Sequence, residues 1–334
     1  MQNSKRTHDL VQITVDPSRE GMSLAAVVRQ ALTHQTGEAV PWSRARDLCR
    51  TGRVKIDGVV IMEDATRLRS GSVVEITPTA PKTTRGVLPR EAVLYLDDDV
   101  IVVDKPKGVV TVPFSEGERD TLVDRVRALL SRVERRERRD ARKANRDVMV
   151  GVVQRLDKDT TGALVFARTM KAKRSLEDQL RVHSVERRYL ALAHGDVVNA
   201  RFESFLVQNR GDGLRGSWGA FRGHEGPPPP EAKRAMTHIR RIEALMGATL
   251  VECRLETGRQ HQIRIHLAES GHPLVGEPVY IRDYRGPRID ASRPMLHAMV
   301  LGFVHPRTGE HVHFEAPLPA DFEACLGSRR TLPG

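Results

Sequence analysis

The sequence contains little that would support a disulfide framework, a zinc site or a membrane span. Its three cysteines, Cys49, Cys253 and Cys325, are far apart and form no C-x-x-C pair. No run approaches the roughly 18 apolar residues of a spanning helix, and the start MQNSKRTHDL lacks the apolar core of a signal peptide. Aromatic residues make up only 4% of the chain, too few for a broad base-stacking platform. We therefore expect a soluble cytoplasmic protein with ordinary reduced thiols.

The charge of the chain is unbalanced toward basic residues. Lysine and arginine number 54 against 43 aspartate and glutamate, which gives a formal net charge of +11 and a pI near 10.0. Such a balance favours a polyanionic partner, either nucleic acid or an anionic membrane surface. The lack of long apolar segments weakens the membrane alternative. At 334 residues, and with about 150 residues per domain, the chain is expected to form two domains.

The N-terminal part predicts two helices followed by a hairpin. Apolar residues recur at helical spacing in the first helix, namely Leu24, Val27, Val28, Ala31 and Leu32. The stretch SRARDLCRTGRVKIDGVV then predicts a short basic helix closed by Gly52, a strand, a turn at Asp57-Gly58 and a returning strand. Five basic residues crowd this unit: Arg44, Arg46, Arg50, Arg53 and Lys55. Such clusters are usually solvated surface, but the helix-turn-strand context favours contact with phosphates.

This context, from Met22 to Ile76, resembles the S4-type RNA-binding module, in which a helix and a GRVKIDG-like turn present basic groups to RNA phosphates. The resemblance implies that the five basic residues bind RNA. The polar, proline-punctuated stretch TPTAPKTTRGVLPR follows and reads as a linker. We therefore expect an S4-type domain with its N-terminal extension over residues 1–80 and a linker over residues 81–91.

Residues 92–326 predict a second domain of the α+β class. VLYLDDDVIVVDKPKG predicts a hairpin, RRYLALAHG a strand, and THIRRIEALMGATLVECRLETGR two strands around Met246-Gly247. HQIRIHLAESG predicts a helix ended by Gly271, and residues 124–147 an arginine-rich helix. RGDGLRGSWGAFRGHEGPPPPEAKRA is rich enough in glycine and proline to read as a loop. Because strands outnumber helices without regular alternation, we expect a mixed, mostly antiparallel sheet.

Two segments concentrate residues suited to chemistry. In VVQRLDKDTTGALVFA, Asp157 lies in a turn between two apolar strands, where an aspartate most often caps the backbone but where catalytic groups also occur. LETGRQHQIRIHL places His261 and His266 five residues apart, which does not fit the i, i+4 spacing of a helical zinc pair. We therefore expect no metal site. Arginines and amides in this segment suit recognition of phosphates or base edges.

Taken together, the C-terminal motifs resemble the RluA family of pseudouridine synthases. LYLDDDVIVVDKPKGVVTVP, QRLDKDTTGALVFA, RRYLALAHG, LETGRQHQIRIHLAESGHPLVGEPVY and LHAMVLGFVHPRTGEHVHFEAPLP occur in the family's order. They cover nearly all of residues 93–319. The resemblance implies a pseudouridine synthase catalytic domain that isomerises uridine within RNA: the N-glycosidic bond is cut, the uracil turns, and a C–C bond rejoins it to the ribose.

The resemblance also implies roles for particular residues. Asp157 matches the catalytic aspartate and Arg264 its basic partner. Tyr189 matches the tyrosine that stacks on the target base, and Arg155 the arginine that fills the gap left when this base flips out. We expect further substrate contacts from Lys105, Arg259, His261 and Gln262.

Elementary chemistry agrees with these roles. Cleavage of a glycosidic bond develops positive charge at the sugar, which a carboxylate can stabilise or trap. A base inside folded RNA must be extruded before it can react, at a cost of a few kcal/mol, which an inserted side chain and stacking can partly offset. A guanidinium beside the carboxylate would keep it ionised and oriented. The isomerisation requires no cofactor.

Analogy with family members that carry an S4-type module makes ribosomal RNA of the large subunit, the 23S RNA, the leading substrate, with transfer RNA still open. We expect the chain to act as a monomer without a metal. Two other classes of function remain open: a non-catalytic RNA-binding or ribosome-assembly factor that keeps the fold, and a hydrolase that releases the base. Gln154, Thr161 and Glu277 depart from the family's usual His, Ser and Asp.

Overall fold

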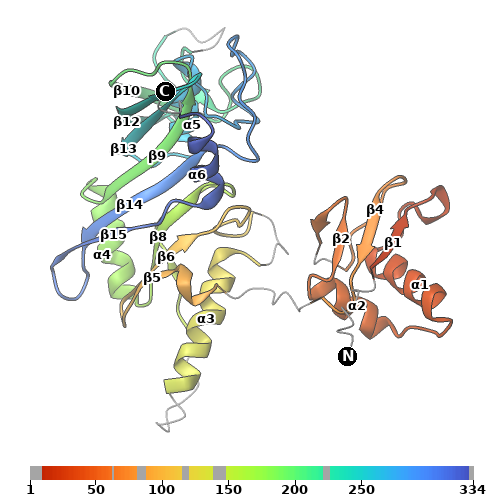
Figure 1. Cartoon of the computed structure of the whole chain (residues 1–334). Helices are drawn as coiled ribbons and strands as arrows, with labels where there is room; N and C mark the ends of the chain where they lie inside the picture. Colours follow the sequence, from red (N-terminus) through yellow and green to blue (C-terminus); the bar gives the residue numbers. More distant parts are fainter. Residues whose placement is uncertain are drawn as a thin grey trace, which may run out of the picture. The chain divides into compact units, whose positions relative to one another are not determined.

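The computed structural model describes residues 10–61, 64–80, 88–114, 120–137, 148–220 and 226–330. Contacts divide the chain into two compact units, Met1–Val87 and Leu88–Gly334 (Figure 1). The boundary between them falls within the segment that the sequence assigns to a linker. No helix in these ranges is both long and apolar enough to cross a lipid bilayer.

The first unit packs two helices on a small antiparallel sheet. Its strands β1 (Val11–Thr14), β2 (Val54–Ile56), β3 (Val59–Val60) and β4 (Val73–Ile76) follow the order β1-β4-β2-β3. A short 3₁₀ helix η1 (Pro17–Arg19) precedes α1 (Leu24–Thr36) and α2 (Trp42–Arg50). The apolar face expected for α1 is buried against Val54, Val74 and Ile76. Ser23 caps α1 by accepting a hydrogen bond from the backbone of Ala26.

The second unit is built on one sheet of eleven strands. Nine of them follow the order β11-β10-β12-β13-β9-β14-β8-β6-β5, while β15 pairs with β14 and β7 with β8. All described pairings are antiparallel except that of β8 with β14. The strands are β5 (Val93–Leu96), β6 (Val100–Lys105), β7 (Gly151–Val152), β8 (Thr161–Ala167), β9 (Glu186–His194), β10 (Ala200–Val207), β11 (Gly216–Ser217), β12 (Lys233–Leu245), β13 (Ala248–Leu255), β14 (Leu296–Val304) and β15 (His311–Glu315). The mixed, mostly antiparallel sheet of an α+β domain is therefore confirmed.

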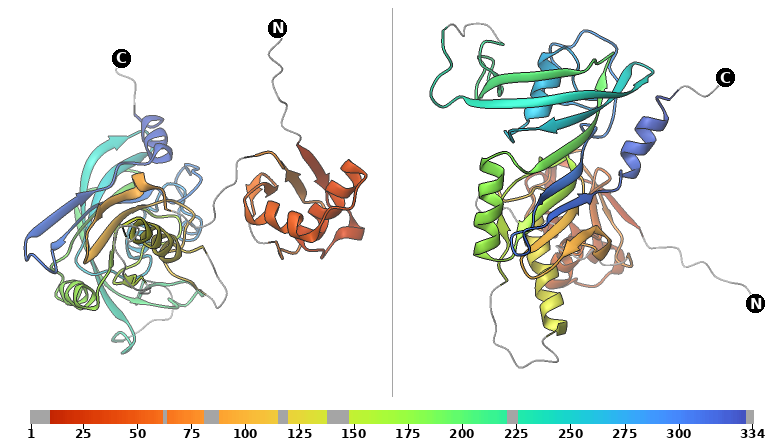
Figure 2. Two further views of the ribbon diagram at one scale, coloured as in Figure 1. Left: turned by 90° about the horizontal axis from the view of Figure 1, so that it is seen from below. Right: turned by 90° about the vertical axis from the view of Figure 1, so that its left-hand side faces the viewer.

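Helices cover both faces of this sheet, as strand alternation requires. Ile101 and Val103 pack with residues of α3 (Leu122–Glu137), whereas Val100 and Val102 pack on the other face with residues of α4 (Met170–Arg181). Further along the sheet, apolar residues of α5 (Gln262–Glu269) and α6 (Ala320–Gly327) belong to separate clusters. Figure 2 shows α4 and α6 on opposite sides of the strands between them. A 3₁₀ helix η2 (Arg90–Ala92) leads into β5.

The structure corrects several boundaries and adds elements. The segment assigned entirely to a loop contains β11, whose two residues pair with the end of β10. Neither β10 nor α4 was predicted. The arginine-rich helix begins at Leu122, and its expected continuation over residues 138–147 lies outside the described residues. The turn at Met246-Gly247 and the helix ending before Gly271 are confirmed.

Candidate active site

Asp157 lies in the loop between β7 and β8, and this loop is held by side chains from distant parts of the chain. Thr111 donates its hydroxyl to the carbonyl of Leu156 at 2.8 Å and accepts the Leu156 amide at 3.2 Å. Arg293 donates from Nη1 to the carbonyl of Asp159 at 3.0 Å and forms a bidentate ion pair with Asp321. The backbone on both sides of Asp157 is therefore fixed, as a preorganised site requires.

Lys105 contributes to the same bracing. Its side chain is fully buried, and Nζ donates to the carbonyls of Pro106, Lys158 and Thr160 at 3.0, 2.8 and 2.8 Å. Burial lowers the pKa of Lys105 to about 7, opposed by the charges of Asp159 and Asp157. Because Nζ is enclosed and donates to three backbone carbonyls, Lys105 braces the loop and, unlike the other residues expected to contact substrate, does not line the pocket around Asp157.

Replacing Lys105 with methionine is expected to destabilise the domain by on the order of 3 kcal/mol, because buried carbonyls lose their donor. Denaturant unfolding measures this change. Lys107→Met is the matched control, since Lys107 pairs with Asp321 at the surface at 2.9 Å and such pairs contribute less than about 1 kcal/mol. Equal losses in the two variants would contradict the bracing role of Lys105.

Gly162 explains why the loop leads directly into a parallel strand pair. The pairing of β8 with β14 begins here, with Thr161 opposite His297 and Gly162 opposite Ala298. Gly162 has φ +115, and a Cβ at this position would lie 2.2 Å from the carbonyl oxygen of Ala298. Only glycine allows this close approach of two backbones. The hydroxyl of Thr161 forms a hydrogen bond with His297 Nδ1 at 2.8 Å.

Arg264, on α5, joins two carboxylates. Its Nη1 lies 3.5 Å from Oδ2 of Asp157, while Nε and Nη2 donate to both oxygens of Glu277 at 2.8 and 2.7 Å. Burial would raise the pKa of Glu277, but the hydrogen bonds and charge of Arg264 hold it below its usual value. The expected pairing of Asp157 with Arg264 is present, and Glu277 is the stronger partner of the guanidinium.

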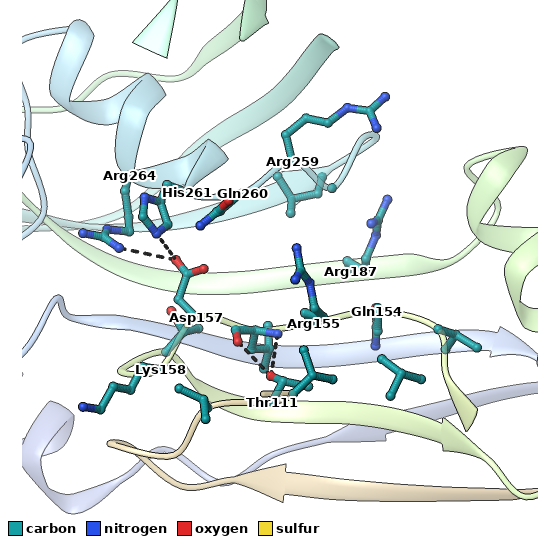
Figure 3. Close-up of a pocket in the computed structure, with 18 of the residues that line it drawn as sticks. Thr111, Gln154, Arg155, Asp157, Lys158, Arg187, Arg259, Gln260, His261 and Arg264 are labelled. Carbon is teal, nitrogen blue, oxygen red and sulfur yellow. Dashed lines mark hydrogen bonds and ion pairs between the residues drawn. The ribbon is translucent and has the colours of Figure 1, made fainter. Parts of the chain in front are cut away.

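His261 faces the same carboxylate. Its Nε2 lies 3.8 Å from Oδ2 of Asp157, and its Nδ1 is hydrogen-bonded to the hydroxyl of Tyr280 at 2.7 Å. Burial lowers the pKa of His261, although the charge of Asp157 opposes this effect. Figure 3 shows the two dashed contacts of Asp157, to Arg264 and to His261. The imidazole is therefore mainly neutral at pH 7 and lies where a bound group would meet Asp157.

Tyr189 occupies the centre of the sheet below this loop. It lies on β9 between Cys253 of β13 and Ala298 of β14, and it lines the same pocket as Asp157. Burial raises the pKa of its phenol, so the hydroxyl is neutral at pH 7. A buried aromatic ring in a pocket wall offers a surface on which a planar ligand can stack.

The pocket around these residues has a volume of about 930 Å³ and is strongly basic on one side. Arg155, Arg187 and Arg259 line it, together with Gln260 and the carboxylate of Asp157. Figure 3 shows Arg264 beside Asp157 and the guanidinium groups of Arg187 and Arg259 away from it. The arrangement suits a ligand with a planar polar part near Asp157 and negative charge near the arginines.

Gln262 is buried at the start of α5, and its amide is fully hydrogen-bonded within the protein. Its side-chain oxygen accepts from the Thr257 hydroxyl and the Arg259 amide, and its nitrogen donates to Met236 and Thr237. These four bonds hold α5 on β12 and on the loop before α5, while Gln262 also lines a small hollow beside Asp157 and Tyr189. Of the expected contacts, Arg155, Arg259 and His261 line the pocket.

The five basic residues expected to bind RNA in the first unit differ in whether their side chains already have partners within the protein. Arg46 and Arg50 pair with Asp64 at 3.7 and 3.0 Å, and Nε of Arg53 donates to the carbonyl of Ala80. Arg44 and Lys55 are exposed and make no side-chain hydrogen bond or ion pair within the described residues. The guanidinium groups of Arg29 and Arg46 lie 4.9 and 5.7 Å from the ring of Trp42. This aromatic anchor was not predicted.

Three residues that organise the pocket were given no role in it from the sequence: Arg187, Arg293 and Glu277, the last of which was noted only as a departure from the family's usual Asp. Each is buried and polar, and buried charged residues rarely persist without a partner or a ligand. The sequence provided little indication of these roles, because no motif or periodic pattern distinguishes these charged residues from the residues next to them. Among the described residues, no group of three or more His, Cys, Asp or Glu is arranged to hold a metal.

Comparison with protein families agrees with this geometry. Residues 99–269 match the family model described as RNA pseudouridylate synthase. A Bacillus subtilis protein named an uncharacterized RNA pseudouridine synthase is 36% identical, over 86% of this chain and 90% of its own length. A Neisseria meningitidis protein named ribosomal large subunit pseudouridine synthase D is 32% identical, over 99% of this chain and 85% of its own.

The solved structure titled human RNA pseudouridylate synthase domain containing 4 has the same fold. Its TM-score to this chain is 0.57 at 20% identity, over 71% of this chain and 92% of that one. The match to the family model extends through the Asp157 loop, Tyr189 and α5. The chain belongs to the RluA family of RNA pseudouridine synthases and is an isomerase.

Proposed function

We propose that this protein converts uridine to pseudouridine in ribosomal RNA of the large subunit, with Asp157 as the catalytic residue. The observation that carries this proposal is the Asp157 carboxylate held 3.5 Å from Arg264 in a pocket of about 930 Å³. The ribosomal substrate is supported by the names of several relatives, including the Neisseria meningitidis protein, which aligns with 99% of this chain.

The proposed reaction begins when the bond between N1 of uracil and C1′ of ribose breaks. Its electron pair stays with the base, and positive charge develops at the sugar, where the Asp157 carboxylate stabilises it. The uracil turns so that C5 faces C1′, and the new C–C bond forms. The proton on C5 then leaves, and N1 gains one, so that substrate and product are isomers. Arg264 orients Asp157 throughout.

Two further residues prepare the substrate in this scheme. Tyr189 presents a buried ring for stacking on the everted uracil. Arg155 is exposed at the pocket rim, two residues before Asp157, and its long side chain can enter the space that the base vacates. Together they offset the few kcal/mol that extrusion of a stacked base costs. The protein acts as a monomer without a metal in this proposal.

The test is to incubate the protein with unmodified large-subunit ribosomal RNA transcribed in vitro, and to map pseudouridine and abasic positions. The proposal predicts pseudouridine at one or a few defined uridines. RNA binding without either product would instead indicate a non-catalytic factor. Abasic positions would indicate a hydrolase, and modification of transfer RNA alone would overturn the ribosomal assignment.

The first unit is proposed to be an S4-type RNA-binding domain, with residues 81–91 as a linker to the catalytic domain over residues 92–326. Its α2-β2 surface carries Arg44, Arg46, Arg50, Arg53 and Lys55. Arg44 and Lys55 are the two whose charges face solvent without an ion-pair partner among the described residues. Counterion release upon RNA binding should therefore depend most on these two.

The double variant Arg44→Gln, Lys55→Gln is expected to weaken RNA binding and to reduce the slope of log K against log salt by about 1.5, because each lost phosphate contact removes roughly 0.7–0.9. Deletion of residues 1–80 should reduce it at least as much. Titrations at several salt concentrations measure the slope. The control Arg241→Gln, Arg330→Gln removes two arginines already paired with Asp196 and Glu243. An equal effect from both pairs would exclude a specific role for the first unit.

A further inference from the structure

Arg187 is the buried charge in the pocket that the proposed reaction does not use. The residue is 7% exposed, lies on β9 two positions before Tyr189, and lines the pocket. Its Nη2 donates to the carbonyl of Glu256 at 2.7 Å, which fixes the guanidinium. Its Nε is buried without any hydrogen-bond partner. A buried guanidinium with free donors is costly unless a ligand completes it.

No carboxylate compensates this charge among the described residues. Three other residues have a buried side-chain nitrogen without a hydrogen bond: those of Arg188 and His305 lie 2.9 Å from Glu186 and Asp97, and that of Arg329 does not line the pocket. Arg187 has no such neighbour within the described ranges, and the nearby charge of Arg259 adds repulsion. Burial lowers the pKa of Arg187, Tyr189 opposes this effect, and the charge of Arg259 adds to it. The site therefore lacks one negative charge.

No side chain of residue 258 covers the guanidinium of Arg187. Gly258 stands against the guanidinium, and a Cβ at this position would lie 2.6 Å from Nη1 of Arg187. Figure 3 shows Arg155, Arg187 and Arg259 on the side of Asp157 away from Arg264. At the Asp157 end of the pocket, the two negative charges of Asp157 and Glu277 exceed the single positive charge of Arg264. A ligand bound across the pocket would thus place its neutral part by Asp157 and its anionic part by Arg187.

We propose that Arg187 binds a phosphodiester of the RNA next to the everted uridine, with Arg259 completing the phosphate site. This inference rests on the proposed function, since RNA brings both a uracil for Tyr189 and a phosphate within one nucleotide's reach of it. Guanidinium groups match phosphate oxygens in charge and geometry. Arg187 is thereby a substrate-positioning residue that sets how deeply the nucleotide enters the pocket.

The test uses a synthetic RNA that contains the mapped uridine, with a neutral methylphosphonate placed in turn at each neighbouring linkage. At one linkage next to the uridine, the methylphosphonate should raise KM of the natural protein roughly tenfold or more, as expected for loss of a charge-assisted contact. Arg187→Gln should raise KM by a similar factor on RNA that contains only natural phosphodiesters. In this variant, the methylphosphonate at that one linkage should no longer raise KM further. The control Arg188→Gln changes the neighbouring arginine, which pairs with Glu186 and Glu252 outside this pocket.

Arg187→Met, which fills a similar volume without unpaired donors, replaces the glutamine variant if thermal unfolding shows that the latter does not fold. A variant that keeps full sensitivity at every linkage, or keeps its KM on unmodified RNA, would overturn the phosphate site. If the natural protein forms no pseudouridine at all, the proposed function fails instead. The two failures are therefore distinguishable.

Discussion

Asp157→Asn should lower the rate of pseudouridine formation by a factor on the order of 10⁴, which is typical when the central group of a catalytic set is removed. The amide is nearly isosteric, so the loop held by Thr111, Lys105 and Arg293 should keep its conformation. What is lost is the negative charge that stabilises the sugar as the glycosidic bond breaks. Single-turnover conversion of the mapped uridine measures the effect, and binding of the RNA should change by less than about tenfold.

Asp159→Asn is the matched control for this experiment. Asp159 lies in the same loop, where its backbone carbonyl accepts from Arg293 at 3.0 Å and its charge acts on Lys105, whereas Arg264 faces Asp157. Its rate should fall by less than about tenfold. A comparable loss in both variants would mean that the total charge of the loop matters. Retained activity of Asp157→Asn would remove Asp157 from the mechanism.

Features that depend on neighbours in sequence were predictable. The hairpin from Val93 to Lys105 and the turn at Met246-Gly247 are encoded by apolar alternation around short polar or glycine turns. Asp157 could be placed on a braced loop because apolar strands flank it closely on both sides. The order of five motifs then identified the family, which periodicity alone could not have done.

Features that depend on distant partners could not be predicted in this way. Lys105 looks like an exposed strand end in the sequence, yet it is enclosed by carbonyls of Lys158 and Thr160, more than fifty positions away. Gln262 likewise uses its amide on β12. Glu277 stands in a loop that no periodic pattern describes. Charged residues at strand ends and in loops have no sequence signal that separates a ligand-facing position from a buried one.

Replacement of Arg264, which pairs with both Asp157 and Glu277, is expected to reduce stability and activity together. Glu277 has no exposed side-chain surface and Arg264 has 9%. Arg264→Met should therefore destabilise the protein by about 3–5 kcal/mol, because it leaves a buried carboxylate without its partner. It should also abolish activity, since Asp157 loses its orienting guanidinium. Denaturant unfolding and single-turnover assays measure the two losses.

The free energy of unfolding should depend on pH with opposite sign in the natural protein and in Arg264→Met. In the natural protein the pKa of Glu277 is lowered, so its contribution to stability is present above about pH 4.5 and is lost as the pH falls through the lowered value. In Arg264→Met the backbone amides of Val279 and Tyr280 still donate to Glu277, but burial, the largest single influence, raises the pKa of this carboxyl once the guanidinium is gone. The native state of that variant then binds a proton more readily than the unfolded chain, so its stability should increase as the pH falls from 8 to 5.

Adding Glu277→Gln to Arg264→Met separates stability from catalysis. Removing both members of a buried pair is far less costly than removing one, so the double variant should recover much of the lost free energy of unfolding and lose the inverted pH dependence. Activity should stay absent, because Asp157 still lacks the guanidinium 3.5 Å away. If activity returned with stability, Arg264 would act only as a structural partner of Glu277, and Asp157 would have to be oriented by His261 and the loop alone.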